Sequence, residues 1–178
     1  MNDATTFGPA ESSHMEQGTD TGTIETTVDI AASPERVFAA LTDPQELAAW
    51  WGSDETYRTS DWRIDVRPAG EWSARTIDSS GNEGSIHGEV IVVDAPRVLE
   101  CTWHASWDEI ASTTVRYELS PAIVRDAPGT RLTVTHTGFN GFVACAGTGA
   151  SYTTALKSVL ETLAHAMTVR RAFVSCAA

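Results

Sequence analysis

Cysteine is scarce in this sequence, and its three copies are far apart. Only Cys101, Cys145 and Cys176 occur in 178 residues, and no Cys-x-x-Cys pair exists. A disulfide framework or a thiolate zinc site needs an even or closely spaced set of cysteines. We therefore expect neither, and we expect the protein to reside in the reducing cytoplasm.

Positive charge is also scarce, since 12 basic residues face 24 acidic ones and Lys157 is the single lysine. The formal net charge of −12 argues against nucleic acid, because binding phosphates requires a basic surface. The same balance disfavours an anionic membrane surface. No apolar run approaches the roughly 18 residues that span a bilayer. We expect neither nucleic acid nor a membrane as a partner.

The first 21 residues lack the basic start and the apolar run of a secretory signal. Their acidic, Ser, Thr and Gly content predicts a disordered leader over residues 1–21. The chain that follows is long enough to bury one core without disulfide bonds. We expect a single domain over residues 22–171 and a C-terminal tail over residues 172–178.

The domain opens with signals for a strand and two short helices. Residues 24–30 alternate apolar and polar side chains, which is typical of a half-buried strand. Ser33-Pro34 begins a helix, with serine as the cap and proline at the first helical position. Asp43-Pro44 repeats that signal, and the second helix is expected to end near Trp50-Trp51-Gly52.

The remainder predicts an antiparallel meander followed by a long helix. Turn-forming residues separate six further alternating runs, at residues 62–66, 71–77, 84–93, 98–105, 113–119 and 130–137. The segment from Pro121 to Gly129 is expected to be a loop. Apolar residues recur at helical spacing from about Ser151 to Arg171. A sheet of seven strands needs cover for its apolar face, so we expect this helix to lie across it. The fold class is α+β.

Several short motifs in this order resemble the START-like (SRPBCC, helix-grip) superfamily. The matching motifs are Ser33 to Phe38, Leu41 to Pro44, Trp50 to Gly52, Asp65 to Gly70, Gly88 to Val90, Asp94 to Leu99 and Thr130 to His136. Within the superfamily the chain is most similar to the branch related to the C-terminal domain of the Hsp90 ATPase activator. Ala69-Gly70 stands where that family usually has two glycines, and Ser151-Tyr152 stands where it often has Gly-Trp. The resemblance covers about residues 22–170.

The resemblance implies a seven-stranded antiparallel sheet wrapped around the C-terminal helix, with an apolar pocket between them. Six tryptophans suit such a pocket, because an indole supplies a large apolar area and one N–H donor. Alternation and resemblance together predict the ligand-binding residues Trp50, Trp72, Trp103, Tyr117, Leu119, Val134, His136, Tyr152, Leu156 and Leu160. For the tryptophans, packing in the core is the alternative role.

The function predicted from these features is non-covalent binding of a hydrophobic or aromatic small molecule, polyketide-like or lipid-like. Sequestration, transport or self-resistance would each use such binding. A cyclase or aromatase, with His136 or Tyr152 moving a proton, is one alternative, and a chaperone-interaction module is another. We assign no catalytic residue and expect binding rather than catalysis. The sequence carries no signal for an oligomeric state.

Metal and cofactor sites are not predicted. His87 and His104 fall on successive strands and His136 on the last, but their spacing matches no metal-binding motif. Cys145 follows His136 by nine residues without a third residue to orient the pair, so a thiolate nucleophile is not expected. The glycines between residues 138 and 149 lack the Lys and Ser/Thr of a phosphate loop. We expect no cofactor.

Overall fold

The computed structural model of the chain describes residues 22–52, 57–107, 112–139 and 158–167. The predicted leader, the predicted tail and the glycine-rich segment up to residue 149 lie outside these ranges except for Gly138 and Phe139. The first part of the predicted C-terminal helix also lies outside them, and with it Tyr152 and Leu156.

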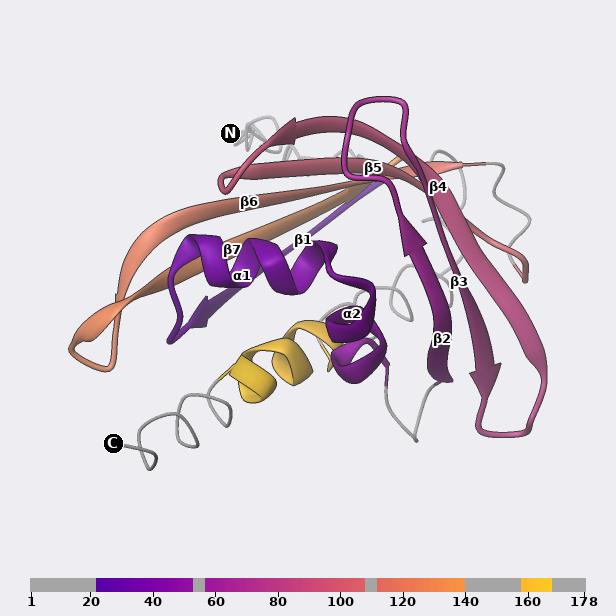
Figure 1. Ribbon diagram of the computed structural model, residues 1–178, viewed down its shortest axis with the longest axis horizontal. Helices are drawn as coiled ribbons and strands as arrows, with labels where there is room; N and C mark the ends of the chain where they lie inside the picture. Colours follow the sequence, from indigo (N-terminus) through magenta and orange to yellow (C-terminus); the bar gives the residue numbers. More distant parts are fainter. Residues whose placement is uncertain (1–21, 53–56, 108–111, 140–157, 168–178) are drawn as a thin grey trace, which may run out of the picture.

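Seven antiparallel strands form one strongly curved sheet (Figure 1). They are β1 (Thr23–Ile30), β2 (Tyr57–Ile64), β3 (Glu71–Asp78), β4 (Glu83–Asp94), β5 (Val98–Ala105), β6 (Thr113–Val124) and β7 (Ala127–Thr137). The order across the sheet is β1-β7-β6-β5-β4-β3-β2, so every neighbour except the β1–β7 pair is joined by a hairpin. The sheet begins and ends on strands that flank the two short helices.

Two short helices, α1 (Pro34–Thr42) and α2 (Pro44–Trp50), connect β1 to β2. The Ser33 side chain caps α1 by accepting a hydrogen bond from the Arg36 N–H at 3.4 Å. Asp43 ends α1 and caps α2, where its carboxylate accepts hydrogen bonds from the backbone N–H groups of Gln45 and Glu46. The two helices therefore meet at a single residue, which fixes a sharp corner on the concave side of the sheet (Figure 1).

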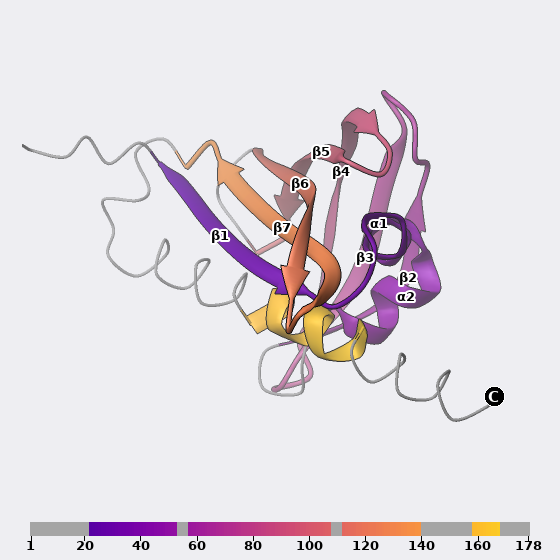
Figure 2. The ribbon, with the colours of Figure 1, turned by 90° about the vertical axis from the view of Figure 1, so that its left-hand side faces the viewer.

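Residues 158–167 form a helical segment that also lies on the concave side (Figure 2). Its apolar face consists of Val159, Leu160, Leu163 and Met167, which are 0–6% exposed and belong to the main core cluster. The α+β helix-grip fold predicted from the sequence is thus confirmed. No helix in the described ranges is long and apolar enough to cross a membrane.

The hairpin of β6 and β7 is longer than predicted. The segment from Pro121 to Gly129 is not a loop, because Arg125 and Asp126 join the strands in a tight turn with φ of 50° and 61°. Two consecutive turn residues with positive φ give a backbone twist that matches the twist of the two strands in a two-residue hairpin. Pro121 and Pro128 are tolerated here because their strands have no further neighbour at these positions. Strand β5 pairs with β6 only up to Glu118, and β1 pairs with β7 only from Thr130.

Strand β2 begins earlier than its alternating pattern indicated. Tyr57 to Ser60 already pair with β3, whereas the alternating run predicted from the sequence begins at residue 62. The register shifts between Ser60 and Arg63, and Asp61 adopts a φ of 53° at this bulge. The extra residue breaks the alternation of apolar and polar side chains, so the first half of the strand carried no period-two signal.

Candidate ligand-binding site

Large side chains line the concave face of the sheet under the helices. Trp72 on β3, Trp103 on β5 and Tyr117 on β6 point inward and are 5–9% exposed. Leu41 from α1 and Leu47 from α2 cover them from the opposite side. Strict alternation along β5 and β6 produces this arrangement, because every second residue faces the core.

Trp72 packs flat against β4 because Gly88 lies beneath it. The two residues are register partners, and a Cβ atom on Gly88 would lie 2.6 Å from the Trp72 Nε1 atom. The indole reaches across the glycine and donates a hydrogen bond to the carbonyl oxygen of Thr102 on β5 at 3.1 Å. Gly88 therefore sets the depth at which this wall of the site lies.

Five of the indoles form a continuous aromatic cluster. Trp51 stacks on Trp103 with ring centroids 5.5 Å apart, and Trp62 stacks on Trp72 at 6.1 Å. Tilted contacts link Trp72 with Trp103 at 5.1 Å and Trp50 with Trp51 at the same distance. Aromatic contacts of this kind stabilise a core by about 0.5–1.5 kcal/mol each beyond area burial. The cluster is therefore both a structural core and a large flat apolar surface.

Four of these five indole N–H groups donate a hydrogen bond within the described residues. Their acceptors are Ala40 O for Trp50, Tyr57 Oη for Trp51, Thr59 Oγ1 for Trp62 and Thr102 O for Trp72. The N–H of Trp103 is buried and has no acceptor among the described residues. A buried donor without an acceptor costs about 1–3 kcal/mol, so this group stands out from the others.

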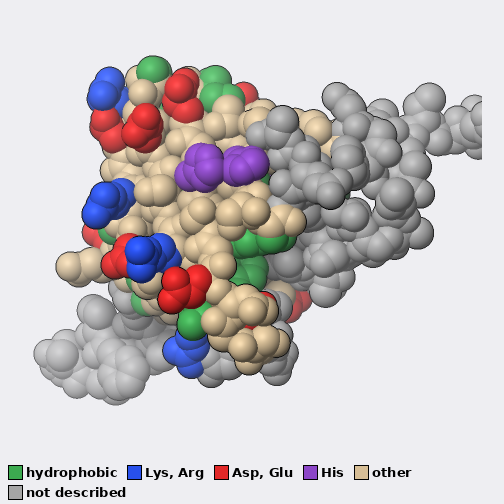
Figure 3. Space-filling view, turned by 90° about the vertical axis from the view of Figure 1, so that its right-hand side faces the viewer, with side chains coloured by type: hydrophobic (Ala, Val, Ile, Leu, Met, Phe, Trp, Pro, Cys, Tyr) green, Lys and Arg blue, Asp and Glu red, His purple; other side chains and the backbone are tan. Residues whose placement is uncertain are grey.

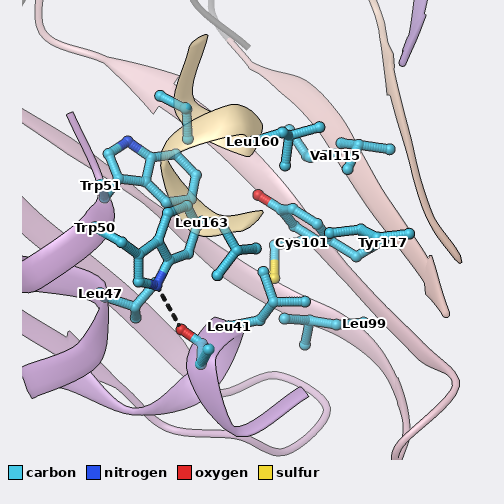
Figure 4. Packing of buried hydrophobic residues seen from close by; sticks show 14 of the residues in the cluster. Leu41, Leu47, Trp50, Trp51, Leu99, Cys101, Val115, Tyr117, Leu160 and Leu163 are labelled. Atoms are coloured by element: carbon cyan, nitrogen blue, oxygen red, sulfur yellow. Dashed lines mark hydrogen bonds between the residues drawn. The ribbon is translucent and has the colours of Figure 1, made fainter. Parts of the chain in front are cut away.

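A small cavity lies between the aromatic cluster and the helices (Figure 4). It has a volume of about 30 Å³ and is almost entirely apolar. It is lined by Leu41, Leu47, Trp51, Trp62, Ile64, Trp72, Leu99, Cys101, Trp103, Val115 and Tyr117. Sites for small molecules usually measure about 300–1,000 Å³. The protein's own side chains therefore fill most of this part of the interior.

Two further polar groups line the cavity. Figure 4 shows the Tyr117 hydroxyl pointing away from its strand toward Trp51, and no hydrogen bond within the described residues satisfies it. Burial raises the pKa of Tyr117, so the hydroxyl stays protonated. Burial, with a smaller contribution from Glu100, also raises the pKa of the Cys101 thiol to about 12. At neutral pH both groups are neutral, and the thiol is not a nucleophile.

His136 lies behind the cluster and is 4% exposed. Its Nε2 atom is 2.7 Å from the Thr113 hydroxyl, which donates its own proton to the Trp103 carbonyl oxygen at 3.3 Å. The imidazole contacts the edge of Trp103 and the ring of Phe139. Through Thr113, His136 is thus connected to the backbone carbonyl group of Trp103.

The structure brings three of the ten predicted residues together at the cavity, namely Trp72, Trp103 and Tyr117. Leu119, Val134 and Leu160 are buried in the same core but do not line this cavity. Trp50 packs under α1 with its N–H bonded to Ala40, and His136 is held by Thr113. Tyr152 and Leu156 lie outside the described residues.

Several cavity residues were not predicted. They include Trp51, Trp62 and Cys101, none of which is among the ten residues that the sequence predicts for the site. The alternation of Trp62 with Ile64, and of Leu99 with Cys101 and Trp103, would have placed these side chains on the inner face. Leu41 and Leu47 could not be found this way, because which helix positions cover the sheet depends on the corner at Asp43.

Comparison with known proteins agrees with the fold and the order of elements. Residues 31–167 match the family model described as "Activator of Hsp90 ATPase homolog 1-like protein". The chain belongs to this family, a branch of the START-like superfamily that the motifs indicated. A search of curated proteins gives no match.

Solved structures of bacterial proteins share the fold. Protein NE0264 from Nitrosomonas europaea superimposes with a TM-score of 0.72 at 21% identity, covering 86% of this chain and 98% of that one. A protein from Arthrobacter aurescens gives 0.71 at 17% identity, covering 83% and 87%. The AHSA1 protein from Silicibacter pomeroyi gives 0.67 at 21% identity, covering 83% and 99%. At these identities the likeness establishes the fold alone.

Proposed function

We propose that the protein binds a flat hydrophobic or aromatic small molecule, polyketide-like or lipid-like, without covalent chemistry. The binding site is the aromatic cavity on the concave face of the sheet. The observation that supports this most directly is the buried Trp103 N–H, which has no acceptor among the described residues, in a cavity whose otherwise apolar walls also include Tyr117. A ligand with a carbonyl or ether oxygen offers the Trp103 N–H the acceptor that no described residue supplies, and the Tyr117 O–H can donate to the same oxygen.

The stacked indoles favour a planar guest. Trp51 on Trp103 and Trp62 on Trp72 present ring faces at interplanar angles of about 20°. A conjugated ring inserted between such faces gains offset-stacking contacts as well as apolar burial. The present cavity of about 30 Å³ accommodates only a small part of such a molecule. Binding therefore requires the indoles to move apart, and Trp62, near the bulge of edge strand β2, is the wall residue best placed to do so.

The same groups favour binding over catalysis by proton transfer. The Tyr117 hydroxyl and the Cys101 thiol have raised pKa values, so both remain protonated at neutral pH. The Nε2 atom of His136 is hydrogen-bonded to the Thr113 hydroxyl, and His136 does not line the cavity. These groups serve as hydrogen-bond donors and as wall, and sequestration, transport or self-resistance would each need no more than that.

The experiment uses two tricyclic probes that differ in one group: fluorenone carries a carbonyl, and fluorene carries a methylene in its place. We expect both to quench the tryptophan fluorescence of the protein and to raise its thermal midpoint. Tyr117→Phe should weaken fluorenone binding by roughly two- to tenfold, the equivalent of one hydrogen bond, and leave fluorene unchanged. Equal effects on both probes would contradict the polar anchor.

A second pair of variants tests the location of the site. Trp62→Ala removes a cavity wall and should tighten the binding of both probes, since the guest no longer displaces that indole. Trp107→Ala is the matched control, because Trp107 is 55% exposed and lies outside the cavity. If the two variants behave alike, or if neither probe binds, the cavity is not the site. A partner protein, as the family description suggests for Hsp90 activators, would then be the better interpretation.

A further inference from the structure

Two histidines face each other on the outer surface of the sheet. His87 on β4 and His104 on β5 are direct register partners, and their ring centroids lie 4.7 Å apart with an interplanar angle of 58°. His87 is exposed and His104 is half-buried. Figure 3 shows the two imidazoles side by side as one patch on this face. The pair lies on the opposite side of the sheet from the aromatic cavity.

Buried residues next to His87 and His104 determine the register of β4 and β5, and so the pairing of the two histidines. The adjacent pair, Ile86 and Ala105, is buried on the inner face at 0% and 1% exposure. Gly88, the next residue along β4, is held under Trp72. A register slip by one residue would turn these buried side chains outward, so the register is strongly specified. The two imidazoles are therefore presented together by the fold, although 17 positions separate them in the sequence.

We propose that His87 and His104 form a two-imidazole binding site for a divalent late transition metal, with Cu²⁺ as the preferred ion. Metal–nitrogen bonds of about 2.0–2.1 Å place a metal about 3.2 Å from each ring centroid, because the centroid lies about 1.1 Å behind its nitrogen. Two such rings at a right angle about the metal have centroids about 4.5 Å apart, and at a tetrahedral angle about 5.2 Å. The observed 4.7 Å falls between these values.

The surroundings suit a cation with an open coordination sphere. No group of three or more His, Cys, Asp or Glu side chains in the described part of the chain could hold a metal, so water completes the coordination. The carboxylate of Glu89 follows His87 by two residues on the same face, and Glu71 pairs with Glu89 from β3. The net charge of −12 adds a favourable long-range field. Imidazole ligands and the general order of divalent affinities both favour copper.

Copper binding to the full chain at pH 7.5 tests the proposal. One equivalent of Cu²⁺ should give an electron paramagnetic resonance spectrum with hyperfine splitting from two nitrogen ligands. His87→Gln and His104→Gln should each lower the Cu²⁺ affinity at least tenfold and remove the two-nitrogen pattern. His165→Gln is the matched control, because His165 is an exposed histidine in the helical segment 158–167. It should leave both the affinity and the spectrum unchanged.

Thermal unfolding separates loss of the site from loss of the fold. Without metal, His87→Gln and His165→Gln should unfold at the temperature of the parent protein, because exposed substitutions change stability by about 0.5 kcal/mol or less. His104→Gln, at a half-buried position, should remain folded with a slightly lower unfolding temperature. With Cu²⁺, the parent and His165→Gln should gain thermal stability, and the His87 and His104 variants should not. A two-nitrogen spectrum that survives either single substitution would overturn the proposal. So would an unchanged affinity in both variants.

Discussion

The two faces of β4 and β5 are constrained differently, although residues adjacent in the sequence form them. Trp103 packs inward against three other aromatic rings, whereas His104 points outward beside His87. The inner face is apolar, and its buried Trp103 N–H has no acceptor in the part of the chain that the structure describes. The outer face carries polar groups in pairs, such as Arg116 and Glu100 at 2.6 Å. The inner face is therefore constrained by packing, while the outer face can change its side chains at little cost in stability.

The largest expected difference between the faces concerns Gly88 and its neighbour His87. A Cβ atom on Gly88 would lie 2.0 Å from the carbonyl oxygen of Thr102, so Gly88→Ala forces the backbone or Trp72 to move. We expect a loss of about 3 kcal/mol in the free energy of unfolding. His87→Ala, on the outer face, should cost about 0.5 kcal/mol or less. Denaturant unfolding at equilibrium measures both.

Gly84 provides the matched control for that comparison, because it lies on the same strand and the same face. A Cβ atom there would meet side-chain atoms of Thr76, Ser106 and Trp107 at 2.9–3.1 Å, and no backbone atom that close. Gly84→Ala should therefore cost much less than Gly88→Ala. Near-ultraviolet circular dichroism should change more in the Gly88 variant, which displaces the buried Trp72, than in the Gly84 variant, where the indole contacted is the exposed Trp107. Equal losses would show that chain entropy, not the close approach of Trp72, controls these positions.

How much the sequence predicted also differs between the faces. Alternation, together with the family resemblance, predicted Trp72, Trp103 and Tyr117 as inward-facing residues, because a period of two is read directly from the chain. The motifs indicated the family, and with it the order of the strands. The His87–His104 contact depends on the register between two strands, and spacing along the chain carries no information about register. Two histidines on different strands can therefore lie side by side without any metal-binding spacing in the sequence.

The cavity was the least predictable feature. Its volume depends on how five indoles pack, and the pairing of Trp51 with Trp103 follows from the corner at Asp43. The sequence predicted a roomy pocket, whereas the space bounded by the described walls is about 30 Å³. Side-chain packing to native density is a property of the whole core, and no local pattern shows it.

An intermediate effect is expected from Cys101, whose inward thiol contrasts with the outward carboxylate of its neighbour Glu100. Burial raises the pKa of the thiol from 9.0 to about 12 in the folded protein. Below pH 9 the thiol is neutral in both the folded and the unfolded chain, and its contribution to stability is complete. Above pH 9 the thiol of the unfolded chain ionises while the buried one does not, so this contribution is lost as the pH rises toward 12. Between pH 8 and pH 10 the loss should be about 1 kcal/mol.

Cys101→Ala isolates most of this contribution, because burial, and not the thiol, is the main cause of the raised pKa of Tyr117. Denaturant unfolding at pH 8, 9 and 10 should show a shallower loss of stability in the variant than in the parent. Peptide mapping after treatment with iodoacetamide at pH 8 adds a second measurement. Cys101 should remain unlabelled in the folded protein and react once guanidinium unfolds the chain. Parallel stability curves, or rapid labelling of the folded protein, would show that the thiol is accessible.

The smallest expected effect lies in the turn between β2 and β3, which belongs to neither face. Ala69 has a φ of 60°, and its N–H donates to the carbonyl oxygen of Val90. An L-residue in this left-handed region costs about 1–2 kcal/mol, whereas glycine costs about 0.5–1 kcal/mol in chain entropy. Ala69→Gly, which restores the usual glycine pair of the family, should therefore stabilise the protein by about 0.5 kcal/mol. Denaturant midpoints for this variant and for Ala49→Gly, within helix α2, should shift in opposite directions. A loss of stability in both would mean that the turn holds Ala69 without strain.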